Sequence, residues 1–406
     1  MTVFSRGYNP AAVTAALAQP TIEGLQRAFA TLSRGARLLV DPRASLGPAQ
    51  VQRQPMPALV SYSAITAAEI LEVGLMALLR DRSLADLSPD PEHAAVLHSI
   101  APTAFPRDPA GLFRLHAVDR SPRVGQLLTR PVPTGWSTIG FTPRMREGAY
   151  GGNAADWTAW EAGSIPVSQQ LGSGTSLTVS GRWLASLVHQ DAPFLIPLLV
   201  SQQLLAAKAP LSNRFPVLPN EAPFVAGGGA MALQCAIAAP CQAAMRDAWR
   251  YKWSLNRPRP DQLWRLGMEG NLHPDFLAKG RPIIDLIGPY LSSTYAEGAP
   301  IHSDYPSGHA VLAGVGFTVL KAWFANGPVP ALGITSLHAE LDLMAWHMAV
   351  GRSWAGIHTR SSLLAGLALG EAHTVAHLNA LRLAEHPAQM VRETRIFGFN
   401  GQELRV

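Results

Sequence analysis

The stretch DYPSGHAVLAGVG, residues 304–316, begins with turn-forming polar residues and continues as a run of small and apolar ones. The run predicts a buried helix over residues 309–325, so Ser307 and Gly308 lie at its start. Backbone N–H groups at a helix start have no intrahelical acceptor, and such an end favours an anion. His309 adds a group that exchanges a proton near neutral pH. The stretch alone fits an ordinary helix start with an incidental histidine equally well, so other segments must decide.

Helical patterns dominate the rest of the chain. Apolar residues recur at steps of three and four, as in amphipathic helices. This periodicity predicts further helices over residues 59–80, 181–208, 224–253, 336–350 and 362–384. Strand-like alternation is scarce, and only residues 174–179 read as short β structure. We therefore expect an all-α fold of helical bundles, joined by long loops at about residues 41–58, 100–175 and 209–223.

Composition narrows the class of protein. Of the 406 residues 48% are hydrophobic and 15% charged, which is typical of a folded globular chain. The formal net charge of +5 suits an anionic ligand, but no Lys/Arg block predicts a nucleic-acid partner. The most apolar stretch, residues 194–205, is interrupted by Pro197, Gln202 and Gln203, so we expect a soluble protein with no membrane partner. The first twenty residues lack the pattern of a signal peptide, which favours a cytoplasmic location. Cys235 and Cys241 are predicted to be two buried thiols.

Two more segments carry cations beside predicted helix ends. In AWRYKWSLNRPRPDQLWRL, residues 248–266, Lys252 and Arg259 are seven apart. Pro258 and Pro260 force the chain out of the helix, so Arg259 is expected at a helix end or in the following loop.

The second segment is MAVGRSWAGIHTRSSLLAGLALGE, residues 348–371. Here Gly351 is expected to end one helix, with Arg352 next to it. His358 precedes the next helix, whose predicted N-cap is Ser361 or Ser362. Each cation alone is most simply a solvated residue. Three cations and two histidines beside helix ends together predict a site for a tetrahedral or trigonal oxyanion.

In this order the segments resemble the signature of the vanadium-dependent haloperoxidases and their relatives in the type 2 phosphatidic acid phosphatase superfamily. That signature is K-x6-RP, then PSGH, then [SG]-R-x5-H-x3-D. Lys252, Arg259 and Pro260 fill its first block, residues 306–309 the second, and Arg352 and His358 the third. The resemblance covers about residues 180–385 and implies an all-α fold with two four-helix-bundle-like cores. We accordingly expect an N-terminal helical and loop region over residues 1–175 and a catalytic bundle over residues 176–406.

The resemblance also implies the roles of the site residues. The vanadate-binding groups would be Lys252, Arg259, Arg352, His358 and the N–H groups of Ser307 and Gly308. His358 would form the protein's bond to vanadium, and His309 would be the general base for hydrogen peroxide. Halide would leave as hypohalous acid and halogenate small organic molecules. Relatives imply a homo-oligomer, and phosphate is expected to fit the same site.

Three other positions refine this hypothesis. His302, seven residues before His309, resembles a histidine of the bromide-oxidising branch, so bromide is expected over chloride and His302 is a third candidate catalytic residue. Trp249 lies where the family places an aromatic beside the halide path, with plain core packing an equal alternative. Asp191 falls where relatives place a carboxylate that pairs with the site arginines.

One position departs from the signature. Ser362 stands where the family has an aspartate that hydrogen-bonds the metal-linked histidine. Ser362 either caps its helix or replaces the aspartate without its charge, and in the second case Ser362→Asp should tighten vanadate binding.

Other functions remain open at this point. A phosphohydrolase would use His358 as the nucleophile on phosphorus and His309 as the acid that protonates the leaving alcohol. A non-redox relative would bind an oxyanion without halide or phosphate turnover. His373 and His377 have the spacing of a zinc-binding pair, but neither a glutamate between them nor a third ligand is evident.

Overall fold

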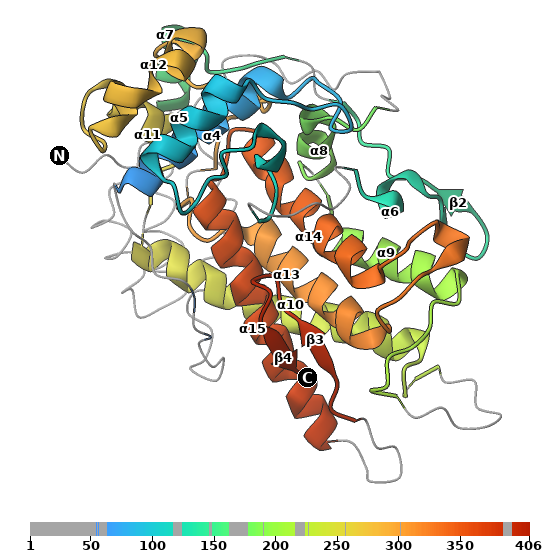
Figure 1. Cartoon of the computed structure of the whole chain (residues 1–406). Coiled ribbons are helices and arrows are strands. Elements are labelled where there is room, and N and C mark those ends of the chain that lie inside the picture. The colour runs from blue at the N-terminus through green and yellow to red at the C-terminus, as the bar shows by residue number, and fades with distance from the viewer. Residues whose placement is uncertain are drawn as a thin grey trace.

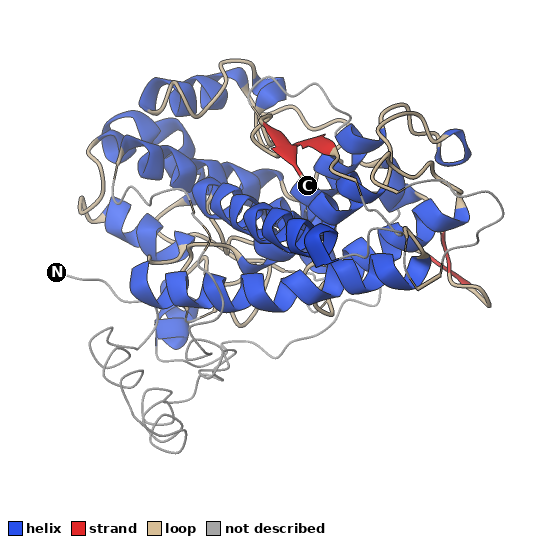
Figure 2. Cartoon of the chain, turned by 90° about the horizontal axis from the view of Figure 1, so that it is seen from below, coloured by secondary structure: helices blue, strands red, loops and turns tan. Residues whose placement is uncertain are grey.

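The computed structural model describes residues 54, 56, 63–116, 124–145, 148–161, 178–189, 191–215, 224–225, 227–255, 257–300, 302–384 and 392–406. Its helices are α4 (Ala64–Leu79), α5 (Pro91–Ile100), α6 (Gln126–Thr129), α7 (Ala154–Glu161), α8 (Gly181–Leu187), α9 (Leu195–Ala206), α10 (Ala230–Leu255), α11 (Pro260–Met268), α12 (Asp275–Ile287), α13 (Gly308–Trp323), α14 (Leu337–Trp354) and α15 (Arg360–Ala384). The 3-10 turns are Pro109–Gly111 and Pro330–Leu332. Strands β1 (Val132–Pro133) and β2 (Thr138–Ile139) pair antiparallel, as do β3 (Arg395–Phe397) and β4 (Glu403–Arg405). The all-α prediction is confirmed (Figure 2).

Helix α13 is the centre of the larger helix group, where it packs against α10, α14 and α15 (Figure 1). All of its residues from Ala310 to Trp323 are buried. Glycines let α13 and α15 approach closely: a Cβ on Gly370 would lie 2.2 Å from the carbonyl oxygen of Val311, and one on Gly366 would lie 2.6 Å from that of Ser307. This close approach brings the start of α13 against the first turns of α15, and so brings two of the sequence motifs together.

A second group contains α4, α5, α11 and α12, which lie together at one end of the molecule (Figure 1). Helix α4 packs against the other three and also against α14 of the first group. The two groups agree with the expected pair of four-helix cores. The domain boundary near residue 175 stays a prediction, and α4, from before it, packs on helices from after it.

Several local predictions are wrong. The helix predicted over residues 181–208 is divided: α8 ends at Leu187, and α9 begins at Leu195, directly after Pro193 and the left-handed Phe194. Helices α6 and α7 and the β1–β2 pair lie inside the predicted loop 100–175, and helices α5, α11 and α12 and the β3–β4 pair were not predicted. Of the predicted β segment only residues 178–179 are described, and they form no strand. Cys235 is exposed, whereas Cys241 is buried, and burial raises the pKa of the Cys241 thiol to about 12.

Within the part of the chain that the structure describes, every helix is too short or too polar to cross a bilayer.

Folding stability should depend on His347 of α14. Its Nε2 accepts a hydrogen bond from the backbone N–H of Gly125 at 3.1 Å, just before α6, and burial lowers its pKa from 6.5 to about 4. The unfolded chain therefore takes up this proton at a higher pH than the folded chain. Stability from this residue is present above pH 6.5 and is lost as the pH falls toward 4. Between pH 7 and pH 5 we expect His347 to cost about 2 kcal/mol of unfolding free energy.

Urea denaturation at the two pH values measures this loss in the natural protein and in His347→Gln, whose amide oxygen can still accept from Gly125. An equal loss in both proteins would show that other groups cause it.

Candidate anion-binding active site

The three sequence motifs meet in one buried site formed by helix ends. Lys252 comes from the last turn of α10, Arg259 immediately precedes α11, and Arg352 lies near the end of α14. His358 lies in the connection from α14 to α15, and His309 in the first turn of α13. The charges of Arg259, Lys252, Arg352 and His309 all act on the pKa of His358, so these five side chains are near one another.

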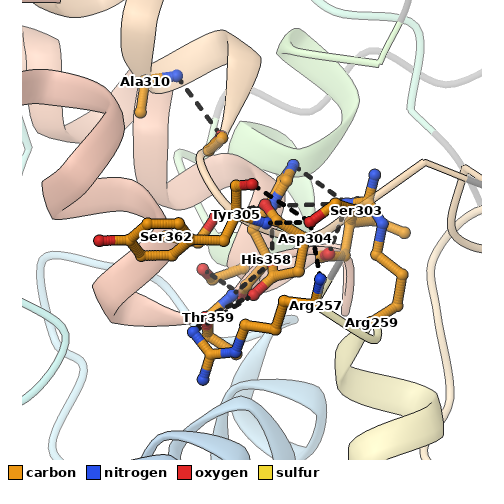
Figure 3. Close-up of polar contacts among 12 residues, drawn as sticks. Arg257, Arg259, Ser303, Asp304, Tyr305, Ala310, His358, Thr359 and Ser362 are labelled. Atoms are coloured by element: carbon orange, nitrogen blue, oxygen red, sulfur yellow. Dashed lines mark hydrogen bonds and ion pairs between the residues drawn. The ribbon is translucent and has the colours of Figure 1, made fainter. Parts of the chain in front are cut away.

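Arg259 contacts the rings of both His358 and His302, and Figure 3 draws it at the right of the site. Pro260 occupies the first position of α11, so Arg259 stays extended, and its side chain is fully buried. Its Nε donates to the carbonyl oxygen of His302 at 2.8 Å, and NH1 donates to that of Ile357 at 3.0 Å. The guanidinium thus connects the loop before α13 to the loop before α15.

Lys252 and Arg352 complete the cationic set. The Nζ of Lys252 donates to the carbonyl oxygen of Ser303 at 2.9 Å, and the side chain is buried. Burial, together with Arg259 and Arg352, holds the pKa of Lys252 well below its usual value, against an opposing effect of Asp304. Because like charges crowd here, a bound anion would favour the charged form of the lysine.

Arg352 has donor capacity left. Its NH1 donates to the carbonyl oxygen of Val188 at 3.1 Å and to the hydroxyl of Tyr295 at 3.3 Å. Its Nε is buried and has no hydrogen-bond partner among the residues described. A buried, unsatisfied guanidinium nitrogen beside two further cations suits a multi-oxygen anion such as vanadate or phosphate.

His358 is held through both ring nitrogens. Its Nδ1 lies 2.7 Å from Oδ1 of Asp304 and 3.1 Å from Oγ of Ser362, whereas Nε2 lies 3.1 Å from NH1 of Arg259 (Figure 3). Burial, followed by the nearby cations, holds the pKa of His358 well below its usual value, so the ring is neutral at neutral pH. The sequence analysis missed Asp304, although it is the first residue of the quoted stretch.

Ser362 does not cap helix α15. The helix begins at Arg360, so both predicted cap residues, Ser361 and Ser362, lie inside it and the cap prediction is wrong. The Ser362 hydroxyl instead donates to the carbonyl oxygen of Asp304 at 2.6 Å.

His309 contacts Asp191, with Nε2 2.9 Å from Oδ1. Burial would raise the pKa of Asp191, but His309 and then Arg352 outweigh it and lower the pKa, so the aspartate is ionised. Asp191 was expected to pair with the site arginines; its close contact is with His309, while Arg352 acts on it only through charge. The His309 side chain is 24% exposed, so small molecules can reach it.

His302 and Trp249 form one wall beside the cations. Their rings meet edge to face with centroids 4.5 Å apart, and the Nζ of Lys252 lies 5.6 Å from the Trp249 ring. NH2 of Arg259 donates to Nδ1 of His302 at 2.8 Å. Burial, with Lys252 and Arg259, holds the pKa of His302 well below its usual value. His302 therefore belongs to the site as a neutral ring that accepts a hydrogen bond from Arg259. Near neutral pH the ring does not carry a second proton.

The start of α13 is arranged differently from the prediction. Ser307 is the N-cap, and its hydroxyl accepts from the N–H of Ala310 at 3.5 Å. Its own N–H donates to the carbonyl oxygen of Ser362 at 3.0 Å, which satisfies one of the two N–H groups expected to bind the anion. Gly308 is the first residue of the helix.

Buried ion pairs from α4 support the His358 loop. Glu69 accepts from NH2 of Arg257 at 3.2 Å and from the hydroxyl of Ser361 at 2.9 Å. One turn along, Glu72 accepts from Nε of Arg360 at 3.1 Å. Such long-range pairs leave no local sequence pattern, and the sequence analysis missed them.

The histidine pair on α15 has another explanation. Nε2 of His373 lies 3.1 Å from Oδ2 of Asp247 on α10. Within the described residues, three or more His, Cys, Asp or Glu side chains nowhere gather as a metal site would require.

Both the sequence and the fold of the chain resemble known proteins. Residues 228–383 match the family model of the PAP2 superfamily. A vanadium-dependent bromoperoxidase of Corallina pilulifera is 36% identical over 98 residues, which is 20% of this chain and 16% of that protein. One of Ascophyllum nodosum is 30% identical over 177 residues, 34% of this chain and 32% of that protein. The matches thus span a third or less of these relatives' lengths.

The fold has a much longer match. A homohexameric vanadate-dependent bromoperoxidase structure from Ascophyllum nodosum superposes with a TM-score of 0.82, over 99% of this chain and 84% of that one, at 19% sequence identity. The chain thus carries a PAP2 superfamily domain over residues 228–383, has the all-α fold of a vanadate-dependent bromoperoxidase and resembles the vanadium-dependent bromoperoxidases in part of its sequence.

Proposed function

We propose that this protein is a vanadate-dependent haloperoxidase that oxidises halide, bromide in preference to chloride, with hydrogen peroxide. Hypohalous acid is the product and halogenates small organic molecules. The observation that carries the proposal is the buried set of Lys252, Arg259 and Arg352 around the neutral ring of His358. The sequence relatives named as vanadium-dependent bromoperoxidases support vanadate as the anion and bromide as the halide.

The donor set fits vanadate. Lys252, Arg259, Arg352 and the N–H of Gly308 would bind its oxygens, and Nε2 of His358 would bind the metal, for which a neutral imidazole is a suitable ligand. When bound, vanadate supplies a Lewis-acid centre that activates peroxide without changing its oxidation state. The cations would offset the negative charge of its oxygens at buried positions, where such interactions are strong.

His309 is the proposed acid–base residue. The Asp191 carboxylate can only accept, so it holds the proton of His309 on Nε2. Nδ1 is then the atom that accepts a proton from hydrogen peroxide, and the resulting imidazolium is stabilised by the ionised Asp191. A homo-oligomer is part of the proposal because the structural relative is a homohexamer.

The test is bromination of a phenolic dye by hydrogen peroxide and bromide, with the purified protein titrated with vanadate. We expect activity that rises with vanadate and saturates, and that is lower with chloride. Hydrolysis of para-nitrophenyl phosphate, inhibited by vanadate and without bromination, would instead identify a phosphohydrolase. Tight vanadate or phosphate binding in calorimetry with neither reaction would identify an oxyanion-binding protein.

A further inference from the structure

We propose that Asp304 is the residue that positions His358. It would replace the aspartate that the vanadium-dependent haloperoxidases carry at the position of Ser362. Asp304 would set the ring orientation and keep the proton on Nδ1, so that Nε2 presents its lone pair to the bound anion. The inference rests on the proposed vanadate site, but it concerns a residue outside the family signature.

The contact with Asp304 assigns the tautomer of His358, and the contact with Arg259 is compatible with it. The Asp304 carboxylate accepts hydrogen bonds from the hydroxyl and N–H of Thr359, so the ring nitrogen 2.7 Å from it, Nδ1, carries the proton. The guanidinium of Arg259 can only donate, and its NH1 lies 3.1 Å from Nε2 and 3.4 Å from Nδ1, so the nearer nitrogen, Nε2, is left to carry the lone pair. The neutral ring therefore has its proton on Nδ1 and its lone pair on the side of the cations.

Asp304 is itself held rigidly. It is fully buried, and Thr359 donates its hydroxyl to Oδ2 at 2.7 Å and its N–H to Oδ1 at 3.3 Å. NH1 of Arg257 lies 3.6 Å from Oδ2. A carboxylate fixed at this many points can hold a histidine ring in one orientation, as metal-site histidines require.

Ser362 acts through Asp304 more than on the histidine directly. Its hydroxyl donates to the carbonyl oxygen of Asp304 at 2.6 Å, and its contact with Nδ1, at 3.1 Å, is longer than that of the carboxylate. The sequence alone predicts that Ser362→Asp tightens vanadate binding. The structure reverses this expectation, because a second carboxylate would be buried beside Asp304 and its carbonyl oxygen.

The first experiment compares vanadate and phosphate binding to Asp304→Asn by calorimetry. Loss of the oriented Nδ1–H should weaken vanadate binding by about 10- to 100-fold, the usual effect of removing such a partner. Phosphate forms no metal–nitrogen bond, and removal of a buried negative charge should leave its affinity unchanged or tighter. Equal weakening of both anions, or unchanged vanadate affinity, would overturn the proposal.

Two further variants make the test specific. In the Asp304→Asn background, Ser362→Asp returns a carboxylate to the family position and should recover vanadate affinity, whereas in the natural protein it should weaken it. Asp342→Asn removes a carboxylate that pairs with Lys321 at 2.7 Å, and it should affect neither anion. If Asp304→Asn does not fold, Thr359→Val removes one donor to Asp304 and should give a smaller loss in the same direction.

A second measurement needs neither vanadate nor turnover. Imidazole ¹⁵N chemical shifts of His358 should show a protonated Nδ1 and a bare Nε2 in the natural protein, and a mixture of tautomers in Asp304→Asn. The opposite tautomer in the natural protein would overturn the role of Asp304. A protein with this tautomer that brominates nothing would overturn the proposed function and leave the positioning role in place.

Discussion

His358→Ala should abolish vanadate-dependent bromination, with a loss of more than about 1000-fold, as is usual when one member of a catalytic unit is removed. In the proposed function this ring provides the metal-binding nitrogen, and Asp304 holds the ring at Nδ1 while Arg259 contacts both ring nitrogens. The cations that bind oxygens remain in the variant, so phosphate binding should persist while vanadate loses its advantage over phosphate. Dye bromination at saturating vanadate, together with calorimetry for both anions, measures this.

The matched control is His273→Ala. That histidine has a side chain 34% exposed and lies beside α12, apart from the motif segments. The control should retain full activity and anion affinity. Vanadate-dependent bromination in His358→Ala would place the metal on another residue and end the proposed function.

The sequence predicted the all-α fold class and five of the side chains that lie near one another at the helix ends. Lys252, Arg259, His309, Arg352 and His358 come from segments with fixed spacing and clear helix-end signals, and those helix ends meet in the structure. The helix break at Pro258 and Pro260 and the helix start at Ser307 and Gly308 depend on local residue types, so the sequence alone shows them. Their catalytic roles stay a prediction.

Residues that support the site were not predictable in the same way. Asp304 contacts a histidine 54 positions away, and Glu69 pairs with an arginine 188 positions away. Such pairs depend on how α4, α13 and α15 pack, which one sequence does not show. Helices α11 and α12 are short, and prolines lie at the start of α11 and inside α12, so the sequence analysis did not recognise them. The break between α8 and α9 contains Pro193 and the left-handed Phe194, and the sequence analysis missed this break too.

Arg259→Ala should remove anion binding and also destabilise the fold. The guanidinium satisfies the carbonyl oxygens of Pro300, His302 and Ile357 as well as contacting both histidine rings. Its loss leaves these buried acceptors unpaired, at about 1–3 kcal/mol each, so the unfolding free energy should fall by several kcal/mol. Urea denaturation and vanadate calorimetry measure the two effects.

Arg259→Lys separates charge from geometry. Lysine keeps the positive charge, but a single ammonium cannot satisfy two loops and two rings at once. We therefore expect the variant to keep the positive charge but to hold the loops before α13 and α15 less well. Its vanadate affinity should be about tenfold or more below that of the natural protein, and its unfolding free energy should fall less than in the alanine variant. Arg265→Lys on the exposed side of α11, which pairs with Glu269 at 3.0 Å, is the control and should change neither quantity. An unchanged vanadate affinity in Arg259→Lys would show that the site needs only a positive charge at this position. The hydrogen bonds that join the loops before α13 and α15 would then not determine the shape of the site.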